Sequence, residues 1–237
     1  MIHLFALLSL LLCGVCYTGF QNSSHFHNTS NRRSLLLLVF GGALLLRLLL
    51  AYTTHGFSND IACFAAWADR IFTLGPGQFY SAEMFTDYPP GFMYVLYLIG
   101  ALRSLLQIPY YSDLHILLLK LPAILCDIAC GFLLYREAVK RLHFSDLQGI
   151  FAASAYLFQP AVILNSSCWG QVDSVYTLMI ILMCLFLMKG NLLPAYAVYG
   201  LGVLLKPQML IFTPVLLTGI WDHVFLQDFS WRKFFYN

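Results

Sequence analysis

Long apolar runs, separated by short polar patches, alternate along the chain. The candidates for membrane-spanning helices lie at residues 34–52, 115–135, 147–164, 175–188, 192–205 and 209–225. A helix needs about 20 predominantly apolar residues to cross the hydrocarbon core of a bilayer. The pattern therefore predicts an all-α, polytopic helical membrane protein.

Composition favours the same class. Of the 237 residues, 60% are hydrophobic and 10% are charged, against roughly 25% charged in an ordinary soluble domain. This balance excludes a soluble globular protein. The 13 basic and 11 acidic side chains give a net charge of +2 and are scattered between the apolar runs. We expect membrane lipids around the chain and no nucleic acid partner, because no basic patch follows a phosphate backbone.

Basic residues predict the direction of the first run. Arg32 and Arg33 immediately precede residues 34–52. The positive-inside rule places that end in the cytoplasm. Residues 53–88 then form a long first loop on the outer face.

The second clear run, residues 115–135, is followed by a basic cluster made of Arg136, Lys140, Arg141 and His143. This run should therefore point inward. Counting residues 90–106 as a span would place the cluster outside, so we expect a juxtamembrane helix there. Its double proline, its aromatic residues and Arg103 suit a helix at the outer interface. The later runs then alternate in direction.

The first 33 residues stand apart from this module. Residues 2–17 are apolar but too short for a comfortable span, and they fit either a signal-peptide h-region or an extra first helix. The sequence leaves both open. A polar linker follows, and residues 34–237 form the transmembrane module.

The predicted outer face carries two carboxylates among aromatic residues. Asp60 follows the first helix by a few residues, and Asp87 precedes Tyr88 and two prolines. A carboxylate that aromatic neighbours partly desolvate suits general-base chemistry on a sugar hydroxyl. The alternative is structural, since loop aspartates are commonly solvated or cap helices.

Three further features could bind a ligand or be structural. Lys206 ends an apolar run on the outer face, where it either meets an anion such as a lipid phosphate or extends to the headgroups. Trp169, Gln171 and Asp173 combine an aromatic face with hydroxyl partners, as sugar sites do, although Asp173 or Ser174 also suits an N-cap. Inside the membrane, Arg47 either pairs with Asp127 or extends outward.

The order of these elements resembles the GT-C superfamily of polyprenyl-phosphate-sugar-dependent glycosyltransferases. The resemblance is carried by SNDIACFAAWA, FTDYPPGFMYVLYLIG, a span with Lys120 and Asp127, NSSCWGQVDSVYTL and LLKPQMLIFTPVLL. The most similar group is the bacterial mannosyltransferases related to the eukaryotic PIG-V enzyme of GPI-anchor assembly. The same elements also resemble dolichyl-phosphate-glucose transferases, so the donor sugar stays open between mannose and glucose.

The resemblance implies a GT-C-like N-terminal module and an inverting hexosyl transfer to a lipid or glycan acceptor on the outer or lumenal face. Asp60 matches the catalytic base. The substrate-binding residues that it implies are Asp87, Tyr88, Trp169, Gln171, Asp173, Lys206 and Gln208, with Lys206 near the donor phosphate. Because family members continue for several more helices, residues 34–237 match only their N-terminal part.

Other expectations complete this interpretation. The donor is a polyprenyl-phosphate sugar, no bound metal is assigned, and a divalent metal requirement stays open. The favoured location is a bacterial cytoplasmic membrane, or the endoplasmic reticulum membrane in a eukaryote. The alternative functions are a transporter, whose charges should lie near mid-depth, and a non-catalytic subunit.

Overall fold

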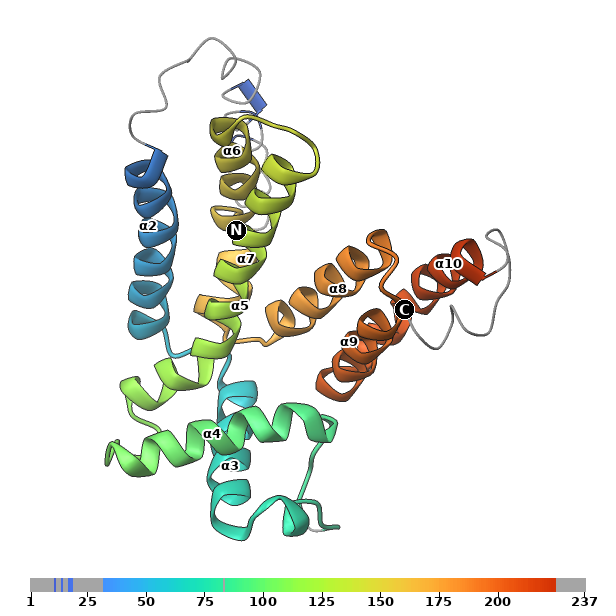
Figure 1. Cartoon of the computed structure of the whole chain (residues 1–237). Helices are drawn as coiled ribbons and strands as arrows, with labels where there is room; N and C mark the ends of the chain where they lie inside the picture. The colour runs from blue at the N-terminus through green and yellow to red at the C-terminus, as the bar shows by residue number, and fades with distance from the viewer. Residues whose placement is uncertain (1–10, 12–13, 15–16, 19–31, 83, 225–237) are drawn as a thin grey trace. The chain divides into compact units, whose positions relative to one another are not determined.

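The computed structural model is helical throughout the part of the chain that it describes, which is residues 11, 14, 17–18, 32–82 and 84–224 (Figure 1). No β-strand occurs among these residues. The expected signal-like segment or extra helix in residues 1–33 falls almost entirely outside them. The longer elements are α2 (Arg32–Thr53), α3 (Ser58–Leu74), α4 (Pro90–Leu105), α5 (Asp113–Lys140), α6 (Asp146–Leu157), α8 (Asp173–Met188), α9 (Leu192–Leu205) and α10 (Thr213–Val224). The shorter ones are η2 (Pro76–Gln78), α7 (Pro160–Ile163), η3 (Leu164–Trp169) and η4 (Pro207–Phe212).

The chain divides into two compact units. Unit 1 combines Met1–Ala65 with Ile108–Ser174, and unit 2 combines Ala66–Gln107 with Val175–Asn237. Each unit therefore joins segments that are far apart in the sequence.

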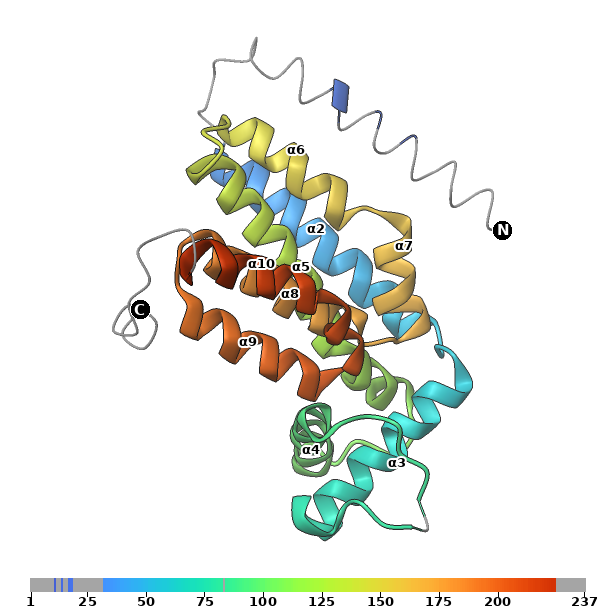
Figure 2. The ribbon, with the colours of Figure 1, turned by 90° about the vertical axis from the view of Figure 1, so that its right-hand side faces the viewer.

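In unit 1, α2 and α5 pack side by side and antiparallel (Figures 1 and 2). At one end, Arg32 donates a 2.8 Å hydrogen bond to the Tyr135 hydroxyl. At the other end, Lys120 Nζ lies 3.2 Å from the Ala51 carbonyl oxygen. The opposite directions predicted for the two runs are thus found in the helices.

Length and composition make α2 and α5 long and apolar enough to cross a membrane. A third candidate is the bent pair of Asp146–Leu157 and Pro160–Trp169, whose parts meet at 51°. The span predicted at 147–164 falls within this pair, which is broken where Pro160 starts a new helix after the chain leaves α6, and its crossing of the membrane stays a prediction. α4, α8 and α9 are shorter apolar helices.

The segment predicted as a long first loop at 53–88 contains a helix that the sequence analysis did not predict, while its place on the outer face stays a prediction. Residues 58–74 form α3. Most of its buried residues recur at the spacing of one helix face, and the buried residues are Ile61, Phe64, Ala65, Trp67, Ala68 and Ile71. This 3.6-residue period is the usual signature of an amphipathic helix, but the polar residues between them obscured it.

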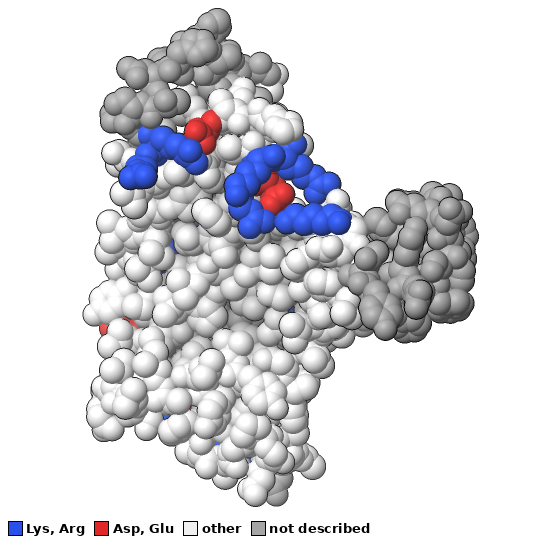
Figure 3. Space-filling view, viewed as in Figure 1, with Lys and Arg blue, Asp and Glu red and all other residues white. Residues whose placement is uncertain are grey.

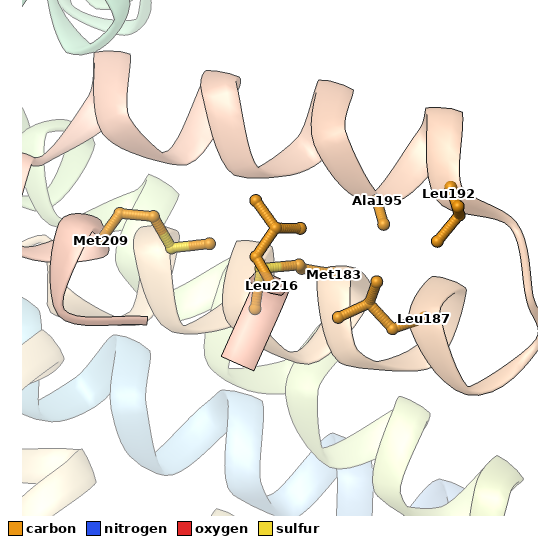
Figure 4. Packing of buried hydrophobic residues seen from close by; sticks show 6 residues of the cluster. All are labelled: Met183, Leu187, Leu192, Ala195, Met209 and Leu216. Atoms are coloured by element: carbon orange, nitrogen blue, oxygen red, sulfur yellow. The ribbon is translucent and has the colours of Figure 1, made fainter. Parts of the chain in front are cut away.

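Unit 2 has its own apolar core. Figure 4 shows Met183 and Leu187 of α8 facing Leu192 and Ala195 of α9. Met209 of η4 and Leu216 of α10 complete this cluster. The helix expected at 90–106 is confirmed as α4 (Pro90–Leu105), while its place at the membrane surface stays a prediction.

Charged residues are concentrated at one end of unit 1. Arg32 and Arg33 begin α2, and a basic cluster lies at the end of α5. Figure 3 shows two groups of charged side chains on this face and few charged side chains on the rest of the described surface in view. A broad uncharged surface of this kind fits contact with lipid.

Candidate functional site

The centre of the candidate site is the carboxylate of Asp60, which lies in the first turn of α3. Its Oδ2 atom accepts a 2.9 Å hydrogen bond from the Trp169 indole nitrogen and a second one from the Gln171 side-chain amide. Its Oδ1 atom has no hydrogen-bond partner among the described residues. Three residues predicted from the sequence are therefore brought together across more than 100 positions of the chain.

The backbone around Trp169 is held by Asn165. The π-helical turn η3 ends at Gly170, in the left-handed region at φ +88°. The amides of Gly170 and Gln171 both donate to the Asn165 carbonyl, at 3.1 and 3.0 Å. A Cβ atom at residue 170 would lie 2.6 Å from the Ile61 side chain, so glycine is needed here both for conformation and for space.

The linker between α2 and α3 contacts the backbone of Trp169. The Phe57 amide donates to the Trp169 carbonyl at 2.9 Å. Gly56 has a φ of +79°, and a Cβ atom there would lie 2.7 Å from the same carbonyl oxygen. This close approach of two backbone segments fixes Asp60 against Trp169.

Asp173 supports this arrangement at the start of α8. Its carboxylate accepts a 2.9 Å hydrogen bond from the Asn165 side chain, whose backbone carbonyl in turn holds Gln171. The N-cap role suggested for Asp173 or Ser174 is wrong for both residues, because α8 already begins at Asp173. The Ser174 hydroxyl instead donates to Asp127 at 2.5 Å.

Two buried cations stabilise the helices beneath the site. Arg47 pairs with Asp127 at 3.1 Å, which confirms the pairing predicted from the sequence. Lys120 is fully buried and donates to the Thr54 carbonyl and hydroxyl, at 2.7 and 3.1 Å, as well as to Ala51. Since the C-terminal end of a helix carries partial negative charge, the Lys120 ammonium stabilises the end of α2.

Unit 2 brings together a different pair of predicted residues, Tyr88 and Lys206. Lys206 follows the last turn of α9, and its ammonium lies 5.8 Å from the centre of the Tyr88 ring. The Tyr176 ring lies 5.6 Å from the same ammonium. At these distances both rings attract the cation through their π faces. Tyr176 lies within the NSSCWGQVDSVYTL element, but the sequence analysis did not assign it a role.

The loop before α4 is held by aromatic residues. The Tyr88 ring lies 5.7 Å from that of Trp67 and 5.5 Å from that of Phe92. The Tyr80 hydroxyl donates to the Tyr88 carbonyl at 3.0 Å. Burial raises the pKa of Tyr80 above its ordinary value, so this hydroxyl remains a neutral donor.

Asp87 and Gln208, which were predicted to bind substrate, are both exposed. Within the described part of the chain, neither side chain has a hydrogen bond to another residue. Asp60 belongs to unit 1 and Lys206 to unit 2, and their action on one substrate stays a prediction. No group of three or more His, Cys, Asp or Glu that could hold a metal occurs among the described residues.

No family model, no curated protein and no solved structure matches the chain.

Proposed function

We propose that the chain forms a GT-C-like module of a polytopic membrane glycosyltransferase. It transfers a hexose, with mannose favoured over glucose, from a polyprenyl phosphate to a lipid or glycan acceptor. The observation that carries the proposal is the Asp60 carboxylate, which the Trp169 indole and the Gln171 amide hold by one oxygen while the other is left for a substrate. The motif resemblance and the long apolar helices also support it.

The proposed reaction is a single displacement. An acceptor hydroxyl gives its proton to Oδ1 of Asp60 as its oxygen forms a bond to the anomeric carbon of the donor. The bond between that carbon and the lipid phosphate breaks, and its electron pair leaves with the phosphate. The leaving phosphate is a weak base, so no general acid is required, unlike the two-carboxylate arrangement of glycosidases. One displacement inverts the anomeric configuration.

Lys206 is the proposed partner of the donor phosphate. Lys206 follows the last turn of α9, and two tyrosine rings contact its ammonium. A cation fixed in this way stabilises the negative charge that develops on a leaving phosphate without a large reorganisation. We place the site on the outer face of a bacterial cytoplasmic membrane, or on the lumenal face of the endoplasmic reticulum in a eukaryote.

The proposal is tested by transfer of labelled sugar from polyprenyl-phosphate mannose and polyprenyl-phosphate glucose in membranes that contain the full-length gene product. Asp60→Asn should lower the transfer rate by about 10²- to 10⁴-fold, the usual contribution of a general base. Asp60→Glu should recover part of it. The exposed Asp113 provides the matched control, since Asp113→Asn should leave transfer unchanged.

Two results would contradict the proposal. Full transfer activity in a folded Asp60→Asn protein would exclude Asp60 as the base. Absence of transfer from either donor by the wild-type protein would favour the alternatives of a transporter or a non-catalytic subunit.

A further inference from the structure

Two aromatic side chains lie exposed beside Asp60. Phe57 is 45% exposed and Trp169 is 50% exposed. Their ring centres are 5.3 Å apart, with an angle of 39° between the planes. We call Phe57 and Trp169 the aromatic pair.

The aromatic pair is fixed in place before any ligand binds. The Trp169 indole nitrogen donates to Asp60, and the Trp169 carbonyl accepts from the Phe57 amide, each at 2.9 Å. A tryptophan that only anchors a protein in the headgroup region keeps its N–H available for that polar layer. Here the N–H is bound within the protein, although the side chain as a whole is half exposed.

The surroundings of the aromatic pair indicate the chemistry of its ligand. A lipid chain would need apolar surface alone, whereas here the rings adjoin the Asp60 carboxylate and the Gln171 amide. A pyranose ring matches both parts, because it has a face of C–H groups and a rim of hydroxyls. Apolar walls with a few fixed polar groups are typical of small-molecule sites.

We propose that the aromatic pair is a subsite for a pyranose ring of the acceptor, so that the acceptor carries a sugar and is not a simple lipid alcohol. This inference rests on the proposed function. In an inverting displacement, the base contacts the attacking hydroxyl, on the side of the anomeric carbon opposite the leaving phosphate. Groups that surround the base therefore contact the acceptor. A hydroxyl of the stacked ring gives its proton to Asp60 Oδ1 and its oxygen to the new glycosidic bond.

The experiment compares octyl α-mannoside, a sugar ring on an alkyl chain, with decanol, a hydroxyl on an alkyl chain. Both are offered as acceptors to full-length protein with a polyprenyl-phosphate sugar donor. The wild-type protein should glycosylate octyl α-mannoside and not decanol. Phe57→Leu should raise KM for octyl α-mannoside by about five- to tenfold, the value of a lost ring contact, and leave KM for the donor unchanged.

Two variants control this measurement. Phe57→Tyr keeps the ring and should retain the wild-type KM, which separates loss of the ring from a folding defect. Phe132→Leu removes an equally exposed phenylalanine, 51% exposed on α5, and should have no effect. Binding of octyl α-mannoside to the purified proteins is also measured by tryptophan fluorescence, without donor.

Each outcome decides the inference. A higher KM for the donor in Phe57→Leu, with KM for octyl α-mannoside unchanged, would assign the aromatic pair to the donor and overturn it. Equal use of decanol, or no change in either KM, would also overturn it. Absence of transfer from any donor, combined with octyl α-mannoside binding that Phe57→Leu weakens, would support a sugar subsite and contradict the transferase proposal.

Discussion

Asp127 is a fully buried carboxylate with both oxygens occupied. Four side chains donate hydrogen bonds to it, namely Arg47, Tyr156, Ser166 and Ser174. They come from α2, α6, η3 and α8, so one residue of α5 connects most of unit 1. A buried charge is tolerated only when it is paired and hydrogen-bonded. The packing of these segments therefore depends on the ion pair between Arg47 and Asp127.

Arg47→Met should destabilise the protein by about 3–5 kcal/mol, because it leaves the Asp127 charge buried without its cation. The double variant Arg47→Met/Asp127→Leu removes both charges and should recover much of that loss. Thermal unfolding in detergent micelles measures both. Arg33→Met, at an exposed position of α2, should leave stability unchanged. Equal losses in the single and double variants would show that the ion pair does not carry the effect.

The sequence predicted part of this chemistry. The pairing of Arg47 with Asp127 follows from the high cost of isolated charges in an apolar helix, which requires little knowledge of the fold. The contribution of Ser166 was not predictable, because it depends on the π-helical turn that directs its hydroxyl to Asp127 at 2.6 Å. For the same reason the sequence could place Trp169 and Gln171 in one loop but could not predict that both bind one oxygen of Asp60.

The packing of α4 against α9 connects two of the sequence motifs within unit 2. Gly91, which ends the DYPPG sequence, lies so close to α9 that a Cβ atom there would be 2.6 Å from the Leu204 carbonyl oxygen. Leu204 lies two residues before Lys206. The contact therefore holds Tyr88, two residues before the start of α4, near the Lys206 ammonium.

Gly91→Ala should separate α4 from α9, because the neighbouring atoms belong to the backbone and cannot easily move. We expect a loss of about 1–3 kcal/mol in stability, typical of overpacking, and a raised KM for the polyprenyl-phosphate donor. The control is Gly200→Ala on α9, where a Cβ atom would have no neighbour within 4 Å. Alanine there should be neutral or stabilising, since it favours helix. Thermal unfolding and donor KM are measured for both variants.

A donor KM unchanged by Gly91→Ala, with stability also unchanged, would contradict the importance of this contact. The helices themselves were largely predictable, since long apolar runs with few charged residues and with proline or polar boundaries correspond to α2, α4 and α5. α3 was missed because Asp60, Asp69 and Arg70 lie among its apolar residues in the sequence. Its period was nevertheless present in the sequence. The proximity of Tyr176 to Lys206 depends on the packing of α8 with its neighbours and has no sequence signal.

The distribution of charge along unit 1 gives the protein a direction with respect to a membrane. The start of α2 and the end of α5 lie together at the basic end, where Arg32 also pairs with Asp146 at 3.2 Å. Asp60 follows the opposite end of α2. The positive-inside rule predicts that the basic end is cytoplasmic. We therefore propose that the Asp60 site is on the outer face, where a lipid-linked sugar is proposed to bind.

Cysteine labelling tests this direction and the role of α4 together. In a full-length variant whose native cysteines are replaced, Asn59→Cys and His143→Cys introduce thiols at two exposed positions. A membrane-impermeant maleimide should label residue 59 in intact spheroplasts and residue 143 only after permeabilisation. If α5 alone crosses the membrane between these positions, they lie on opposite faces. If α4 also crosses, both lie on one face.

Labelling of both residues from outside would therefore make α4 a membrane span and would contradict the juxtamembrane prediction. Labelling of residue 143 alone would invert the orientation and place Asp60 on the cytoplasmic side, where the acceptor and the donor headgroup would have to be found instead.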